Sequence, residues 1–311
     1  MRRTPLNLFL LMTVVLAVSA CSRQSLYDNA IAWERSGAGL EPAQVSIGEL
    51  DIAYLRSKEP VDGETLVLIH GFGANKDNWT RLAKEFEGQF NIYALDLPGH
   101  GDSSKPLNIG YRFENQVRYV HQTMAALGIK RFHMMGNSMG GAITALYAAT
   151  YPEQVRTAVL FDPAGIMEFE SELVERVEAG GNPLIPRQEG DFDRLLDFAL
   201  EKRPFVPWPI FDVMEEKAIA NQAVNEVIFA AIRDAGFEPD FRNAITDIQA
   251  PVLVLWGKLD RVIDYRNADV FVEAIPNARK VILDDIGHAP MVEAPARSAA
   301  LFEAFLAEQH P

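Results

Sequence analysis

The chain has 311 residues, of which 48% are hydrophobic, and its formal net charge is −14 at pH 7. A protein with this net negative charge repels nucleic acid and anionic lipid headgroups, so these polyanions are excluded as partners. The single cysteine, Cys21, excludes an intramolecular disulfide. The apolar content is sufficient for one large domain with an insertion.

The first twenty residues have the composition of an export signal. Arg2 and Arg3 precede an apolar run, Leu6 to Val18, which is shorter than the roughly 20 residues of a membrane span. The run ends in Val18-Ser19-Ala20-Cys21, which resembles the lipobox of bacterial lipoproteins, where the cysteine thiol is acylated and becomes the new N-terminus. We therefore expect residues 1–20 to be a lipoprotein signal peptide and Cys21 to be the lipidation site.

This prediction places an exported protein on a bacterial membrane, facing the periplasm and held by acyl chains on Cys21. Ser22 is not the aspartate that retains lipoproteins at the inner membrane, so the outer membrane is slightly favoured. Two alternatives stay open: a signal peptide whose cleavage site merely precedes a cysteine, and an uncleaved N-terminal anchor. Residues 21–44 are expected to form a lipidated tether that includes a short helical stretch.

The next segments alternate between strand and helix patterns. Period-two alternation over 45–47 and 50–55, broken at Gly48, predicts a β-hairpin. Uninterrupted apolar runs, typical of strands buried on both faces of a parallel sheet, follow at 66–69, 92–95 and 132–135. Helical spacing between them, over 79–86 and 113–127, completes the βα alternation of a doubly wound sheet.

Two further apolar runs, 157–161 and 252–256, are separated by about ninety residues of different character. The interval 164–245 is rich in acids, prolines and aromatics and lacks a strand pattern, so we expect a helical cap over the active site. Its aromatics could instead form only a small core of its own. Residues 45–163 and 246–311 would make up the core domain, ending in a strand at 281–283 and a helix over 295–308.

The strongest chemical signal is Gly136-Asn137-Ser138-Met139-Gly140, which falls directly between a predicted strand and a predicted helix. This is the context of a nucleophile elbow, a turn so tight that the positions two before and two after the serine must lack side chains. The turn exposes the serine hydroxyl at the carboxyl edge of the sheet, where open α/β folds place their sites. Ser138 is therefore the predicted nucleophile.

A serine nucleophile needs a base, and histidine titrates in the right range. Of the six histidines, His288 follows the last predicted strand, in a loop that presents it at the same edge as Ser138. The other five are expected to have structural roles or to lie in a frayed tail: His70, His100, His121, His133 and His310. None stands in H-E-x-x-H or similar metal spacing, so no metal site is predicted.

A carboxylate must orient the histidine and stabilise its charged form. Asp260 follows the strand that ends at Trp256 and so lies at the correct edge. Asp264 is the second choice, and Asp284 and Asp285 are nearer to the histidine only in sequence. The chain order Ser, Asp, His is the one that this type of fold uses.

Acyl transfer also needs backbone N–H groups aimed at the developing oxyanion. One should be the amide of Met139, at the start of the helix after the nucleophile. The other is assigned to Phe72, because His70-Gly71-Phe72-Gly73 supplies a flexible backbone after the strand at 66–69. The alternative for this segment is a glycine turn with no catalytic duty.

From about residue 45 to its end the chain is similar to the α/β-hydrolase superfamily. The motifs that carry the similarity are His70 to Gly73, Asp96 to Gly101, Gly136 to Gly141, Trp256 to Asp260, and Gly287-His288. Within the superfamily, segments 162–166, 182–186 and 260–264 resemble the bacterial family V lipases and the animal monoacylglycerol lipases. The resemblance implies an α/β-hydrolase fold, lipase or carboxylesterase activity on acylglycerols, and a triad on the three positions already chosen.

The expected function is therefore that of a serine hydrolase that cleaves esters of apolar acyl chains through an acyl-enzyme, with no cofactor. An aromatic cap suits an acyl chain, because each buried CH₂ group contributes about 0.8 kcal/mol. One alternative is a hydrolase of carbon–carbon bonds in dienoic diketone-type products, which would use the same triad. Another is a non-catalytic lipoprotein that binds lipid. A haloalkane dehalogenase is disfavoured, because its nucleophile would be an aspartate where Ser138 stands.

Overall fold

The computed structural model describes residues 6–235 and 239–309, and for residues 6–21, 234, 235 and 239 it describes only the backbone. Residues 1–5 of the predicted signal peptide and the side chain of Cys21 therefore lie outside the described part. Within the described residues, no helix combines the length and the apolar character that a membrane span requires.

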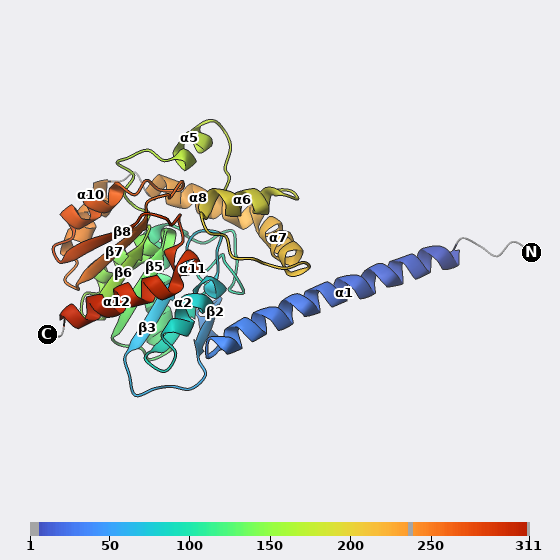
Figure 1. Cartoon of the computed structure of the whole chain (residues 1–311), viewed down its shortest axis with the longest axis horizontal. Helices are drawn as coiled ribbons and strands as arrows, with labels where there is room; N and C mark the ends of the chain where they lie inside the picture. The colour runs from blue at the N-terminus through green and yellow to red at the C-terminus, as the bar shows by residue number, and fades with distance from the viewer. Residues whose placement is uncertain (1–5, 236–238, 310–311) are drawn as a thin grey trace, which may run out of the picture.

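The chain begins with a long helix, α1 (Leu6–Gly37), which projects from the body of the molecule (Figure 1). A strand pair follows, β1 (Leu40–Ile47) and β2 (Leu50–Ser57), paired antiparallel. The hairpin predicted from the alternation is present, but its first strand begins at Leu40. The structure thus differs from the predicted tether, since residues 22–37 are helical and residues 40–44 lie in the sheet.

Helices and strands then alternate to Thr150. In chain order they are β3 (Thr65–Ile69), η1 (Lys76–Trp79), α2 (Thr80–Glu85), β4 (Asn91–Leu95), α3 (Phe113–Ala126), β5 (Phe132–Asn137) and α4 (Met139–Thr150). After β6 (Val155–Phe161) the chain leaves the sheet, and it returns at β7 (Val252–Gly257). The last elements are α10 (Asn267–Ala274), β8 (Ala278–Leu283), α11 (Pro290–Glu293) and α12 (Pro295–Gln309).

These strands form an eight-stranded sheet in the order β1-β2-β4-β3-β5-β6-β7-β8. The pairs β1·β2 and β2·β4 are antiparallel, and the pairs from β4 to β8 are parallel. The doubly wound, mostly parallel sheet predicted from the sequence is confirmed.

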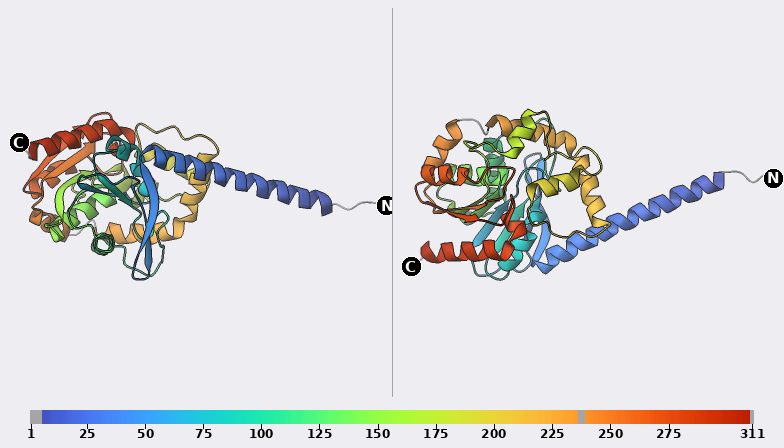
Figure 2. Two further views of the ribbon diagram at one scale, coloured as in Figure 1. Left: turned by 90° about the horizontal axis from the view of Figure 1, so that it is seen from below. Right: turned by 45° about the horizontal axis from the view of Figure 1, so that its top comes forward.

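The sheet is covered on both faces, which explains the uninterrupted apolar runs of its strands. In β3, Val67 and Ile69 pack in the cluster that contains α3, α4 and α10, whereas Leu66 and Leu68 pack in the cluster that contains α2 and α12. Because successive side chains of a strand point to opposite faces, a strand between two helix layers must be apolar at every position. Figure 2 shows the two helix layers from below and from an oblique angle.

The interval between β6 and β7 is helical, as predicted. It contains α5 (Glu172–Glu178), α6 (Asp191–Ala199), α7 (Ile210–Ala220), α8 (Gln222–Ala235) and α9 (Pro239–Ala244), followed by η2 (Ile245–Asp247). In Figure 1 helices α5 to α8 lie above the upper end of the sheet. We refer to residues 164–245 as the cap.

Ion pairs fix the body end of α1 to the rest of the molecule. The guanidinium of Arg35 donates to both carboxylate oxygens of Asp77, at 2.6 and 2.7 Å. Beside this pair, the fully buried Lys76 donates to Asp96 at 2.6 Å and to Asp102 at 2.5 Å. Buried charges are stable only when they are paired in this way. The pair of Arg35 with Asp77 joins the end of α1 to η1.

Candidate active site

Ser138 sits at a sharp turn between β5 and α4, with φ 55° and ψ −118°. Its N–H donates to the carbonyl of Phe161 at 2.9 Å, and its own carbonyl accepts from Ala164 at 2.9 Å. A positive φ in a residue with a side chain is strained and persists only where surrounding contacts enforce it. The backbone geometry at Ser138 is therefore that of a nucleophile elbow.

The flanking glycines make this turn possible. A Cβ atom on Gly136 would lie 2.0 Å from the carbonyl oxygen of Gly140, and one on Gly140 would lie 2.2 Å from that of Ile69. Both contacts are with backbone atoms that cannot move aside. The tightness of the turn predicted glycine at both positions, and these distances give the physical reason.

His288 and Asp260 meet at the same end of the sheet. Nδ1 of His288 and Oδ2 of Asp260 are 2.7 Å apart, and the Asp260 carboxylate is completely buried. That carboxylate also accepts the N–H groups of Val262 and Ile263 and the indole N–H of Trp256. Four donors thus surround this carboxylate, and Nδ1 of His288 must carry a proton to be one of them. This leaves Nε2 unprotonated in the neutral ring.

The loop that carries His288 is attached to the elbow. The side-chain amide of Asn137, the residue before Ser138, donates to the carbonyl of His288 at 2.9 Å. Within the described chain the Ser138 hydroxyl and the imidazole are not hydrogen-bonded to each other. Such pairs are often loose until substrate binds. The structure therefore brings the two residues to one site, and Asn137 has a structural role there that the sequence analysis missed.

Glu293, on α11, is a second residue that the sequence analysis missed. Its carboxylate accepts the N–H groups of Gly287 and Ala289, on either side of His288, at 3.1 and 3.2 Å. It also accepts two N–H groups from the cap, those of Glu201 and Lys202, at 2.9 and 2.8 Å. Glu293 thus joins the histidine loop to the cap.

Asp162, directly after β6, is a third. It is fully buried, has a φ of 45°, and accepts the N–H of Gly257 at 2.9 Å. One ligand atom each from Asp162, Asp260 and His288 lie within 4.8 Å of one another. Burial, and then the charge of Asp260, raise the pKa of the Asp162 carboxyl well above its usual range.

This trio of side chains does not have the character of a cation site. The Asp260 oxygens are occupied by N–H donors, and Nδ1 of His288 is one of those donors. A protonated nitrogen cannot ligate a metal. The signal that could have revealed Asp162 is its position, because it follows a parallel strand at the same edge as the nucleophile.

The competing carboxylates are paired elsewhere. Asp264 binds the guanidinium of Arg266 at 2.7 and 2.8 Å. Asp284 pairs with Lys258 at 2.8 Å, and Asp285 pairs with Lys202 and Arg297. Among these candidates it is Asp260 that contacts His288.

The predicted oxyanion donors border Ser138. Met139 is the first residue of α4, where an N–H has no acceptor within the helix. On the other side, a Cβ atom on Gly71 would lie 3.2 Å from the Cβ of Ser138, so the backbone that leads into Phe72 passes directly against the nucleophile. The ring of Phe72 in turn packs against Phe229 of the cap, with ring centroids 5.6 Å apart.

His70 and His100 are structural in their surroundings, as predicted. Burial lowers the pKa of His70 to about 4 and that of His100 to about 3. His70 accepts the N–H of Leu97 through Nε2 at 3.0 Å, which ties the loop after β3 to the loop after β4. Both rings therefore stay neutral in the range where a general base must exchange its proton.

Comparison with known proteins identifies the family. Residues 64–184 match the model of the α/β hydrolase fold. Lipase 3 of a Moraxella species is 36% identical over 277 residues, which cover 88% of this chain and 87% of that lipase. This chain belongs to the α/β-hydrolase family.

Other members of the family are similar over almost the whole chain. Human monoacylglycerol lipase ABHD6 is 28% identical, covering 89% of this chain and 85% of its own. Among solved structures, a membrane phospholipase A described as a bacterial virulence factor has a TM-score of 0.89 and 42% identity, covering 97% of both chains. The resemblance to bacterial lipases and monoacylglycerol lipases that the motifs indicated is confirmed.

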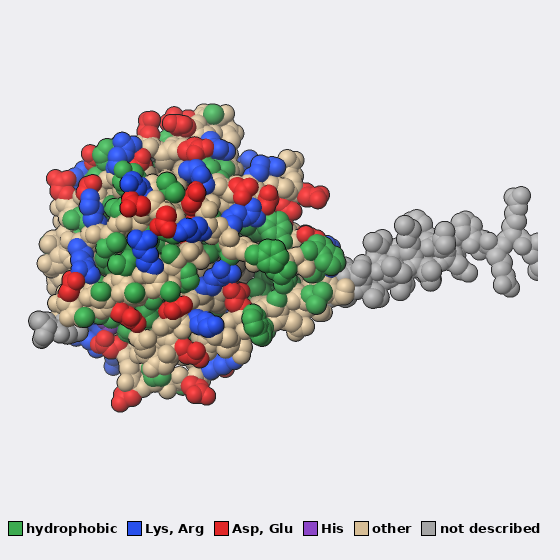
Figure 3. All heavy atoms as spheres, in the orientation of Figure 1, with side chains coloured by type: hydrophobic (Ala, Val, Ile, Leu, Met, Phe, Trp, Pro, Cys, Tyr) green, Lys and Arg blue, Asp and Glu red, His purple; other side chains and the backbone are tan. Residues whose placement is uncertain are grey.

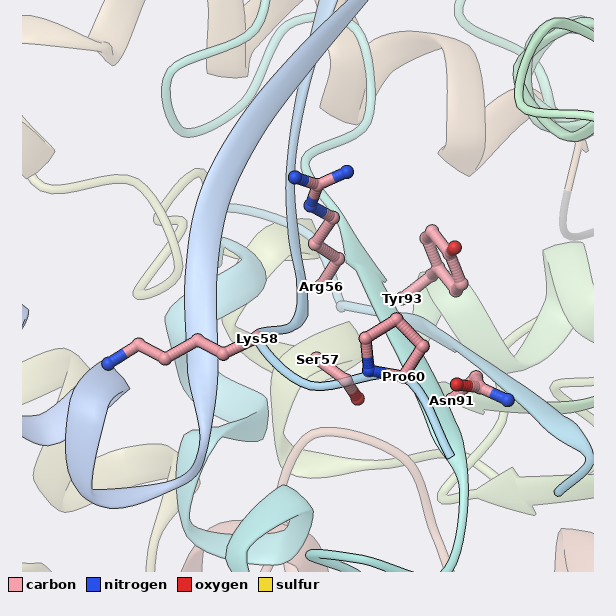
Figure 4. Close-up of a pocket in the computed structure, with 6 residues that line it drawn as sticks. All are labelled: Arg56, Ser57, Lys58, Pro60, Asn91 and Tyr93. Carbon is pink, nitrogen blue, oxygen red and sulfur yellow. The ribbon is translucent and has the colours of Figure 1, made fainter. Parts of the chain in front are cut away.

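A hollow of about 260 Å³ on this hydrolase lies away from the site. Figure 4 shows its lining: Arg56 and Ser57 from β2, Lys58 and Pro60 from the loop after it, and Asn91 and Tyr93 from β4. Asn91 begins a parallel strand, so the hollow is at the amino edge of the sheet, whereas Ser138 and His288 are at the carboxyl edge. It therefore has no part in the candidate active site.

Proposed function

We propose that Ser138, His288 and Asp260 form a catalytic triad that cleaves carboxylic esters of apolar acyl chains through an acyl-enzyme. The chain is a carboxylic ester hydrolase, as its relationship to lipases over most of its length indicates. The proposal concerns the residues, the mechanism and the substrate. The observation that carries it is the 2.7 Å contact between His288 Nδ1 and the buried carboxylate of Asp260, beside a serine in elbow geometry.

In the first half of the reaction Nε2 of His288 takes the proton of the Ser138 hydroxyl as its oxygen attacks the ester carbonyl. The imidazole becomes a cation, and the Asp260 carboxylate stabilises it through the Nδ1–H hydrogen bond. The proton on Nε2 then passes to the departing alkoxide, and the alcohol leaves behind an acylated Ser138. In the second half His288 deprotonates a water molecule that attacks the acyl-enzyme. The proton on Nε2 then passes to the Oγ of Ser138 as its bond to the acyl carbon breaks, which releases the carboxylic acid and restores the free serine.

The negative charge that develops on the carbonyl oxygen falls between two backbone donors. In the proposal these are the N–H groups of Met139 and Phe72. The N-terminus of α4 adds the positive end of a helix dipole at the same place. Because these groups are fixed by the fold, they need no reorganisation as charge develops, and loss of one such donor typically costs about 10²–10³ in rate.

The proposed substrate is an acylglycerol or related acyl ester. Support comes from the relatives, which include lipases and monoacylglycerol lipases. The cap supports it too, because the apolar ring of Phe229 in the cap packs against Phe72 beside the nucleophile. Burial of an acyl chain against such a face stabilises the complex with each additional CH₂.

A fluorophosphonate probe tests the proposal directly. We expect it to label the wild-type protein on the peptide that contains Ser138, as read by mass spectrometry. A panel of monoacylglycerols, triacylglycerols and short p-nitrophenyl esters, with a vinylogous diketone for carbon–carbon hydrolysis, then assigns the substrate class. An unlabelled wild-type protein that hydrolyses none of these esters would refute the proposal and favour a lipid-binding protein.

We also propose that the protein is exported and held at a bacterial membrane, facing the periplasm, through lipid on Cys21. The support is the sequence Val18-Ser19-Ala20-Cys21 after an apolar run. Substitution Cys21→Ser is expected to abolish incorporation of radiolabelled palmitate and to reduce the protein in the membrane fraction. Unchanged incorporation would contradict the lipidation, and unchanged fractionation without incorporation would favour an uncleaved N-terminal anchor.

A further inference from the structure

The loop between α6 and α7 exposes two aromatic side chains that the proposed chemistry does not use. Phe205 is 86% exposed and Trp208 is 74% exposed. An indole or phenyl ring in water loses the free energy that its burial would give, so rings this exposed often mark a contact surface. In Figure 3 apolar side chains gather beside the place where α1 leaves the body.

Contacts between α7 and α1 show which part of α1 lies nearest to this loop. Arg23 of α1 pairs with Asp212, in the first turn of α7, at 3.6 Å and with Glu216, one turn later, at 3.1 Å. One turn further along α1, the ring of Tyr27 receives the ammonium of Lys217 at 4.4 Å. Figures 1 and 2 both show α7 against α1. The beginning of α7 thus lies beside Arg23, only two residues after Cys21.

The position of α7 also locates the two exposed rings along α1. Trp208 is four residues and Phe205 is seven residues before Asp212. Because Asp212 pairs with Arg23, five residues after the apolar run Leu6 to Val18 ends, the loop lies near the end of that run. The backbone of α1 is one uninterrupted helix from Leu6 to Gly37. At 1.5 Å per residue, Val18 is therefore only about 7 Å from Arg23 along the axis.

Lipid is the occupant that this arrangement fits. The lipid would begin at nearly the same position along α1 in either case, whether acyl chains on Cys21 or the uncleaved apolar run holds the protein in the bilayer. That position is close to the loop. Trp and Phe rings at the boundary between an apolar segment and a polar body match the preference of aromatic side chains for the membrane interface. The acidic groups of α7 nearest to this boundary, Asp212 and Glu216, are paired with Arg23 and do not oppose contact with a zwitterionic bilayer.

We propose that Phe205 and Trp208 form a lipid-binding face that inserts the loop between α6 and α7 into the interface of the bilayer from which α1 emerges. This inference rests on the proposed attachment to a membrane and not on the proposed catalytic mechanism. The loop is also close to the site in sequence, since Phe205 follows Ala199 by six residues, and the Ala199 carbonyl accepts the N–H of His288 at 2.8 Å. A loop held in the interface would thus hold the cap next to the source of an acyl substrate.

The four tryptophans provide the test. Trp79 and Trp256 are fully buried, and Trp33 is on α1 ten residues beyond Arg23, about 15 Å farther along the axis. Full-length protein is reconstituted into phosphatidylcholine vesicles with or without brominated acyl chains, which quench tryptophan fluorescence only at short range. We expect the wild type to be quenched, Trp208→Leu to lose more than half of that quenching, and Trp33→Leu, the matched control, to keep it.

A gain of signal completes the experiment. Placing a tryptophan at the other ring position, in the double variant Phe205→Trp with Trp208→Leu, is expected to restore the quenching. Both side chains are exposed, so neither change disturbs packing. The inference is overturned if the protein does not associate with the vesicles, if Trp208→Leu leaves the quenching intact, or if Trp33→Leu removes as much of it as Trp208→Leu does.

Discussion

Replacing Ser138 by alanine is expected to lower kcat on an ester substrate by about 10⁶-fold, the scale seen when the nucleophile of a serine hydrolase is removed. The physical reason is that no other hydroxyl occupies the elbow, so the acyl-enzyme cannot form. The remaining catalysis would come from the oxyanion donors acting on a water molecule. Kinetics on a p-nitrophenyl ester, with loss of fluorophosphonate labelling, measure the effect.

The substitution should leave the fold intact, because it removes one oxygen and keeps the backbone. Ser103→Ala serves as the matched control. Ser103 is also a buried serine, but its hydroxyl donates to the carbonyl of Asp96, away from the elbow, so labelling of Ser138 should persist in this variant. If Ser138→Ala retained labelling or lost activity only a few-fold, another nucleophile would have to be sought.

The sheet could be predicted from the sequence because its strands are buried on both faces. Continuous apolar runs such as 66–69 and 252–256, when they alternate with segments of helical spacing, are typical of strands in a parallel sheet covered by helices. The elbow could be predicted because its motif is short and falls between a predicted strand and a predicted helix. Within the turn, the carbonyl of Gly140 excludes a side chain on Gly136, whereas the side chain of residue 140 is excluded by the carbonyl of Ile69 on the neighbouring strand. The family assignment that this motif indicated is confirmed.

Residues that act through distant contacts were not predictable in this way. Asp162 bonds to Gly257, which is 95 positions away, and the Asn137 side chain bonds to His288, which is 151 positions away. Glu293 is close to the histidine in sequence, yet its bonds to Glu201 and Lys202 depend on where the cap folds. The sequence around Glu293 resembles that of a solvent-exposed helix, so it does not indicate that this carboxylate has partners in the cap.

The N-terminal region shows the same limit. Glycine and serine near residue 37 suggested a tether with a short helical stretch, whereas the structure has a helix to Gly37 and then a strand from Leu40. The strand forms because β2 offers a complete ladder of partners, from Leu40 opposite Ser57 to Ile47 opposite Leu50. The residue types in 38–44 give little indication of a strand, so it is the pairing with β2 that makes this segment a strand.

Asp260→Asn is expected to lower kcat by about 10⁴-fold while leaving the protein folded. The amide keeps the size of the carboxylate but removes the charge that stabilises the imidazolium. It also offers an N–H toward His288, which favours the tautomer with its proton on Nε2 and so removes the general base. Steady-state kinetics give the loss, and because Ser138 is unchanged, slow labelling by a fluorophosphonate should remain detectable.

Two neighbouring carboxyls sharpen this prediction. Asp264→Asn, on the same loop, removes a charge that is paired with Arg266. We expect this substitution to change kcat by the same small factor in the wild type and in the Asp260→Asn variant. Asp162 lies nearer, but burial, the larger cause of its raised pKa, remains in the variant, and one of its oxygens still accepts the N–H of Gly257. We therefore expect Asp162 not to replace the missing charge. Adding Asp162→Asn to Asp260→Asn should therefore cause little further loss. A single variant that kept about a hundredth of the activity, and a double variant that lost it, would show instead that Asp162 had taken over the role of Asp260.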